Sequence, residues 1–192
     1  MALRPVGYRS LTELLQRERL VAEDPETLEL MRTLRGVRRR GSFTRREFLA
    51  MCRWKSPRAR PHCERNPAFR VRRVSGLALA TRSERRRLEL LTGLHGVSVP
   101  MASAILTLID PRRYGVLDIR VWQLLFRIRS VRWKPRGQGF TFRDWDRFLT
   151  ELRHHARRLG VSVRTVEHTL FWCHRRLQAG TLYARGRRSR AV

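Results

Sequence analysis

The chain of 192 residues contains almost no lysine, although it is strongly basic. Lys55 and Lys134 are its only lysines, so nearly all of its 43 basic residues are arginine. With only 16 acidic residues, the formal net charge is +27. Such a surplus cannot be neutralised within the chain, and it attracts polyanions. Two explanations are open at this point: a surface that binds nucleic acid, or an accumulation of arginine codons in a GC-rich genome.

Cysteines and long apolar runs are also scarce. Cys52, Cys63 and Cys173 are an odd number without regular spacing, and no signal peptide precedes them, so a disulfide framework is not expected. The run over 101–109 is far shorter than the roughly 20 apolar residues that cross a bilayer. We therefore expect a soluble cytoplasmic protein, associated with the nucleoid, that has no membrane partner.

Strand signals are scarce too, and helix signals take their place. Hydrophobic residues make up 42% of the chain, which is enough for a core. Alternating patterns and Asn-Gly or Asp-Gly turns are lacking, whereas helix-capping residues recur before amphipathic segments. We predict an all-α fold, a two-lobed helical bundle of about eight or nine helices. The expected helix starts are Ser10, Asp24, Thr44, Asn66, Thr81, Asp118, Thr141 or Asp144, and Ser162.

The charge is unevenly spread along the chain. Residues 1–30 contain more acidic than basic side chains, whereas the rest of the sequence is strongly basic. A uniform codon bias would not leave one end acidic, so the asymmetry favours a binding face. We expect one domain over 1–178, with an acidic helical part over 1–36. The basic stretch 179–192 is expected to be a disordered tail.

The stretch 94–104 predicts two helices joined by a very short turn. Gly96 allows the tight backbone, Val97 enters the core, and small residues follow where the helices cross. Free amides at the start of the second helix, helped by its dipole, can hold a phosphate oxygen, so Gly96, Val97, Ser98 and Val99 are expected to bind the DNA backbone. An ordinary αα-hairpin that binds nothing is the alternative.

The order Leu94-x-Gly96-Val97, Ala102 and then Val116-Leu117-Asp118-x-x-Val121 resembles the helix-hairpin-helix base-excision DNA glycosylase superfamily, over residues 84–128. The resemblance is closest to the adenine-excising branch. It implies backbone contacts with double-stranded DNA that do not depend on sequence, and a catalytic aspartate, Asp118, facing a flipped-out nucleotide. Supporting phosphate contacts would come from Arg112, Arg113 and Arg120.

The sequence departs from the family at three positions of the hairpin. Pro100 stands where bifunctional members carry a Schiff-base lysine, Ser98 replaces the second glycine, and His95 replaces a proline. Lyase chemistry through position 100 is therefore excluded. Three scattered cysteines cannot supply the four-cysteine iron–sulfur motif of some relatives, and the His and Cys pairs match no zinc module. We expect no metal and no small-molecule cofactor.

Asp118 has two open interpretations. As a helix N-cap it would only stabilise the helix that follows. As a catalytic carboxylate it would stabilise the oxocarbenium-like sugar that forms when an N-glycosidic bond breaks. Both can hold together, because capping would fix the carboxylate in place.

Both lysines occur in the same local phrase, Arg-Trp-Lys, at 53–55 and 132–134. Matched surroundings suggest a role specific to lysine, and tryptophan offers a stacking platform for an extruded base. Trp54 and Lys55 are thus candidates for part of a base pocket. The alternative is a pair of solvated connectors whose tryptophans close the core.

These observations lead to one hypothesis with one alternative. The chain is expected to be a DNA-binding, monofunctional DNA glycosylase-like enzyme of base-excision repair, a hydrolase that removes a flipped base. The alternative is a helix-hairpin-helix module that binds nucleic acid without catalysis. The target base and the oligomeric state do not follow from the sequence.

Overall fold

The computed structural model describes residues 7–18 and 20–178, and these form an all-α fold without a β-strand. The expected fold class is thereby confirmed. The helices are α1 (Leu11–Arg17), α2 (Pro25–Thr33), α3 (Gly36–Arg40), α4 (Arg45–Lys55), α5 (Arg60–Glu64), α6 (Ala68–Ala80), α7 (Glu84–Thr92), α8 (Val99–Ile109), α9 (Ile119–Arg127), α10 (Phe142–Leu159) and α11 (Val163–Leu177), with a short 3₁₀ turn η1 (Pro57–Ala59). The tail over 179–192 lies outside the described residues.

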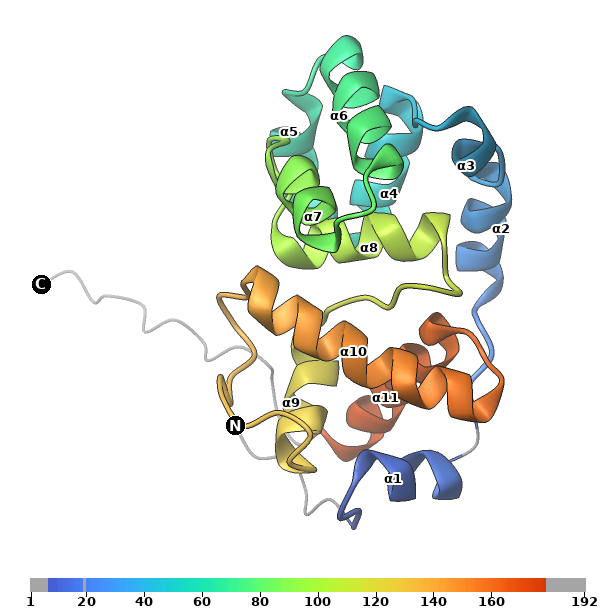
Figure 1. Ribbon diagram of the computed structural model, residues 1–192, viewed down its shortest axis with the longest axis vertical. Helices are drawn as coiled ribbons and strands as arrows, with labels where there is room; N and C mark the ends of the chain where they lie inside the picture. Colours follow the sequence, from blue (N-terminus) through green and yellow to red (C-terminus); the bar gives the residue numbers. More distant parts are fainter. Residues whose placement is uncertain (1–6, 19, 179–192) are drawn as a thin grey trace, which may run out of the picture.

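The helices form two groups, one above the other in Figure 1. The first lobe contains α2 to α8, with α6 against α7 and α4 against α8. The second lobe contains α1 and α9 to α11, with α11 packed on both α9 and α10. A segment without helix, residues 110–118, runs between the lobes and joins α8 to α9.

Helix α8 explains the apolar run of the sequence. Every residue from Met101 to Ile109 is buried, because neighbouring helices and the second lobe surround it. The run that is too short for a membrane is therefore the central helix of the core. Within the described residues, no helix combines the length and the apolar character that crossing a bilayer requires.

Most helix starts lie where capping residues predict them. Asp24, Thr44, Asp118 and Ser162 accept hydrogen bonds from the first turns of α2, α4, α9 and α11. Thr141 and Asp144 form a reciprocal capping box on α10. Two predicted starts are wrong. Ser83 rather than Thr81 caps α7, and the Asn66 side chain binds the backbone of Cys63 and His95 instead of capping α6.

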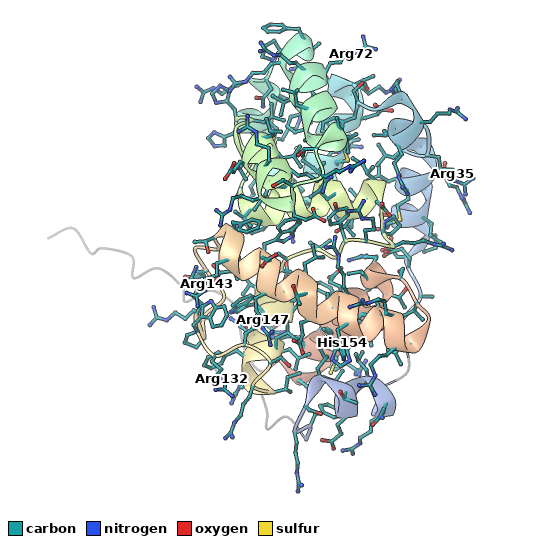
Figure 2. All side chains as sticks on the ribbon, viewed as in Figure 1. Arg35, Arg72, Arg132, Arg143, Arg147 and His154 are labelled. Carbon is teal, nitrogen blue, oxygen red and sulfur yellow. The ribbon has the colours of Figure 1, made fainter. Side chains whose placement is uncertain are left out.

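The acidic N-terminal part lies against the basic last helix. Glu18 pairs with Arg176, and both oxygens of Glu23 accept hydrogen bonds from Arg164, at 2.5 and 2.9 Å. The acidic residues at the start of the chain therefore neutralise part of α11. Most other arginines extend outward, and Figure 2 shows nitrogen-tipped side chains around both lobes.

Candidate nucleic-acid interface and carboxylate site

Asp118 lies where the two lobes meet, at the start of α9. Its Oδ1 accepts a hydrogen bond from the backbone N–H of Arg120 at 2.9 Å, which caps the helix. Its Oδ2 lies 2.7 Å from Nζ of Lys55, the last residue of α4 in the first lobe. The structure thus confirms the capping role and adds an ion pair between the lobes.

The surroundings keep Asp118 ionised. Burial alone would raise the pKa of this carboxyl. The charge of Lys55, together with hydrogen bonds from Lys55 and the Arg120 amide, outweighs burial and lowers the pKa below its ordinary value. The side chain remains 23% exposed, so it is neither sealed in the core nor free in solvent.

Two buried side chains position the segment that leads to Asp118. Ser103 on α8 accepts the backbone N–H of Leu117 at 2.8 Å, and Glu167 on α11 accepts that of Val116 at 3.2 Å. Glu167 is itself paired with Arg164. Both lobes therefore fix the backbone immediately before the carboxylate. Sequence patterns indicated neither contact, because both depend on tertiary packing.

Trp54 and Lys55 point to different partners. The indole N–H of Trp54 donates to the hydroxyl of Thr27 on α2 at 2.8 Å, and the guanidinium of Arg164 lies over its ring at 5.6 Å. Trp54 thereby packs between elements of both lobes, while Lys55 reaches Asp118. The structure brings Lys55 and Asp118 together, and the base pocket stays a prediction.

The turn between α7 and α8 has the tight geometry that its glycine predicts. Gly96 has a φ of +77°, and a Cβ at this position would lie 2.9 Å from atoms of Cys63 and His62 on α5. Val97 is buried, and Ser98 caps α8 by accepting the N–H of Met101. The amides of Ser98 and Val99 donate no hydrogen bond to any described residue. They can therefore receive an anion.

The three predicted phosphate-binding arginines do not gather at this turn. Arg112 and Arg113 follow α8, whereas the turn precedes it, and 11 residues of helix separate them by about 16 Å. Arg113 pairs with Glu84 at 3.3 Å. Arg120 lies beside Asp118, with its guanidinium 5.8 Å from the centre of the Phe171 ring.

One group of residues in the described part of the chain could offer three metal ligands. Atoms of Glu23, Asp24 and His168 lie within 4.8 Å of one another. The guanidinium of Arg164 already binds both oxygens of Glu23, so its positive charge occupies the place that a cation would take. We assign no metal to this group. The three cysteines are free and buried.

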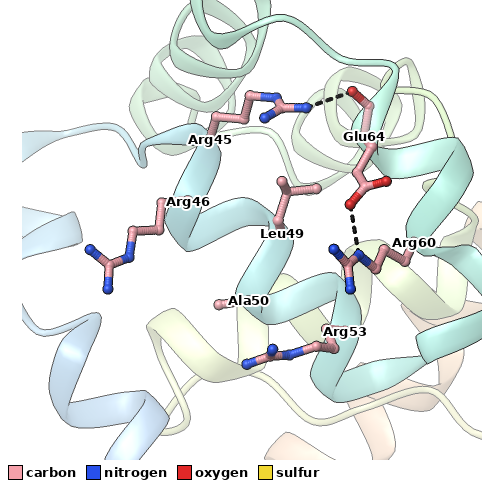
Figure 3. Close-up of a pocket in the computed structure, with 7 residues that line it drawn as sticks. All are labelled: Arg45, Arg46, Leu49, Ala50, Arg53, Arg60 and Glu64. Carbon is pink, nitrogen blue, oxygen red and sulfur yellow. Dashed lines mark hydrogen bonds and ion pairs between the residues drawn. The ribbon is translucent and has the colours of Figure 1, made fainter.

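Asp118 does not line any of three hollows found on the described residues. The one drawn in Figure 3 lies between α4 and α5. Another lies beside Asp110, and the third lies beside Arg112 and the end of α10. In comparisons with protein-family models, curated proteins and solved structures, nothing matches the chain.

Proposed function

We propose that the chain binds duplex DNA and that Asp118 serves hydrolysis of an N-glycosidic bond, as the resemblance to helix-hairpin-helix glycosylases implies. The observation that carries the proposal is the ionised Asp118 carboxylate, held between the lobes by Lys55 and by the first turn of α9. A carboxylate fixed and ionised in this way suits the stabilisation of a developing positive charge.

Charge and local geometry support the binding half of the proposal. A net charge of +27 supplies the attraction to phosphates that does not depend on sequence. The amides of Ser98 and Val99, at the start of α8, would position one phosphate. The acidic side chains Glu18 and Glu23 face α11, so they do not cancel the charge of the first lobe.

The chemical half assigns one role to Asp118. In the hydrolysis, the C1′–N bond of the flipped nucleotide breaks and the base leaves with the electron pair. A water oxygen then bonds to C1′, and the proton that it loses passes to the departing base nitrogen, which leaves an abasic site and a neutral free base. A carboxylate has about four lone-pair positions, and two of those on Asp118 are used. The remaining positions can orient the water or stabilise the oxocarbenium-like sugar.

A non-catalytic module is the second candidate, and two observations favour it. The cap and the ion pair already give Asp118 a complete structural role. None of the three hollows described above is lined by this residue, so none of them is a base pocket at Asp118.

Binding and cleavage can be measured separately. Titration of short duplexes over a series of salt concentrations should show tight binding that weakens steeply as salt rises. Duplexes carrying uracil, hypoxanthine, alkylated bases or 8-oxoguanine are then incubated and treated with alkali, which breaks the strand at abasic sites. Strand breaks support the enzyme. Binding that weakens with salt, without strand breaks on any lesion, identifies the chain as the non-catalytic module. Binding that salt does not weaken contradicts both candidates.

A further inference from the structure

A hollow of about 480 Å³ between α4 and α5 carries an unusual lining. Its rim contains four arginines and one glutamate, and its floor is formed by Leu49 and Ala50 (Figure 3). Its volume lies in the range of sites that hold small molecules or parts of larger ones. Of the lining residues, Arg53 belongs to the Arg-Trp-Lys phrase at 53–55, and we call this site the arginine hollow.

Two of the four guanidinium groups have no partner in the described part of the chain. Arg46 and Arg53 are exposed and make neither a hydrogen bond nor an ion pair there. Arg60 pairs with Glu64 at 2.6 Å, and Arg45 donates to the carbonyl oxygens of Glu64 and Asn66. Hydrogen bonds and an ion pair therefore fix Arg45 and Arg60 in the wall of the hollow, while Arg46 and Arg53 keep an uncompensated positive charge.

The spacing of the two cations suits a polyanion rather than a single small anion. Arg46 and Arg53 are seven residues apart on α4, which is two helical turns or about 10 Å along the axis. Each guanidinium can therefore take a separate phosphate in a bidentate manner. The apolar floor between them can contact the sugar that joins such phosphates.

Helix α5 contacts both the arginine hollow and the turn before α8. Helix α5 forms one wall of the hollow through Arg60 and Glu64. The same helix contacts Gly96 through its residues His62 and Cys63. Asn66 joins the two sites, because its side chain binds the backbone of His95 while its own carbonyl accepts from Arg45.

We propose that the arginine hollow binds the phosphodiester backbone of the same nucleic acid that the turn at 96–99 holds, so that the bound strand crosses α5 and extends along α4. This proposal rests on the proposed DNA binding and adds a second backbone contact to it. The hollow lies on the face of α4 that carries Arg46 and Arg53, whereas Lys55, nine residues after Arg46, lies on the other side of the helix and pairs with Asp118.

The test compares two double variants that remove the same charge. Arg46→Gln with Arg53→Gln empties the hollow of its free cations. Arg35→Gln with Arg39→Gln removes two exposed arginines at the start of α3 and within it, which do not line the hollow and whose guanidinium groups have no partner in the described residues. The measurement is the affinity for an undamaged duplex at several salt concentrations, with circular dichroism to show that both variants fold.

We expect the slope of log affinity against log salt to fall by about 2 in the hollow variant, since each lost phosphate contact contributes about 0.9. The α3 variant should keep the slope of the parent protein. An unchanged slope in the hollow variant, or equal changes in both variants, overturns the inference. A parent protein that does not bind DNA contradicts the proposed function instead.

An acidic peptide provides the remaining arm of the test. Poly-glutamate is titrated against the parent and the hollow variant under the same conditions. The inference is overturned if the parent protein binds poly-glutamate and the hollow variant does not, while both bind the duplex equally. That result would assign the hollow to an acidic protein partner.

Discussion

The ammonium of Lys55 lies 2.7 Å from the carboxylate of Asp118 and connects the end of α4 to the start of α9. The other lysine forms a similar ion pair within the second lobe, where Lys134 pairs with Asp144 in the first turn of α10. The repeated Arg-Trp-Lys phrase thus corresponds to a repeated contact, an ammonium on an aspartate at a helix start. A compact ammonium on a flexible stem fits this place beside the capped turn.

Replacing Lys55 should destabilise the fold. In Lys55→Met, Asp118 loses its counter-charge at a position where the two side chains are only 17% and 23% exposed. We expect a loss of about 1–3 kcal/mol in the free energy of unfolding, less than for a fully buried pair because water reaches both groups. Urea denaturation measures this loss.

A double-mutant cycle with Asp118→Asn isolates the energy of this pair, since the double variant removes both charges. The exposed pair Arg17–Glu13, at 3.0 Å, is the matched surface control, and Arg17→Met should cost less than about 1 kcal/mol. Equal costs for Lys55→Met and Arg17→Met would contradict the structural role given to the Lys55–Asp118 pair.

Gly96 should tolerate no side chain. Its φ of +77° disfavours other residues, and a Cβ would lie 2.9 Å from the backbone nitrogen of Cys63. We expect Gly96→Ala to lower the free energy of unfolding by about 2–4 kcal/mol, from backbone strain together with overpacking. Gly139 has a φ of +62° with nothing within 4 Å, so Gly139→Ala reports the strain alone. The structure requires Gly96→Ala to be the more damaging of the two.

The free energy of unfolding should fall as the pH decreases from 6.5 to 4, in part because His174 becomes protonated. Burial and the positive charge of Arg120 lower the pKa of His174 to about 4, from an ordinary value of 6.5. The unfolded chain therefore binds this proton first as the pH falls. The stability that the neutral imidazole contributes is present above about 6.5 and is lost progressively toward pH 4, on the order of 3 kcal/mol.

The variant His174→Gln removes this titration and leaves a donor for the side-chain oxygen of Gln123, which lies 3.2 Å from the imidazole Nε2. Denaturation curves between pH 6.5 and 4 should then show a shallower loss of stability than in the parent. His154 is exposed, and His154→Gln is the matched control for the same substitution outside this contact. A His174→Gln curve as steep as that of the parent would refute the assignment.

Much of the helical fold follows from local sequence. Thr44 with Glu47, Asp24 before Pro25, and Asp118 before an amphipathic stretch all act over one helical turn, so the sequence contains the whole signal. The short helices α3 and α5 were not predicted, and they account for the excess over eight or nine. Five residues carry too little periodicity to indicate a helix.

The candidate site was less accessible to sequence reasoning. The pattern around Asp118 indicated a cap, and the structure confirms it, but Lys55 is 63 residues away along the chain. Ser103 and Glu167 contact the preceding segment only because α8 and α11 meet there. Contacts of this kind depend on how the lobes pack, and no local spacing encodes them.

The most direct test of the account is removal of the Asp118 charge while its size is kept. Asp118→Asn should abolish alkali-sensitive strand breaks on the lesion that the parent protein attacks, and it should retain duplex binding within a few-fold. Asp144→Asn is the matched control, because Asp144 is also an aspartate at a helix start that pairs with a lysine. The folded Asp144→Asn variant should produce the same strand breaks as the parent protein. Cleavage by Asp118→Asn at the rate of the parent protein would contradict the proposed catalytic role.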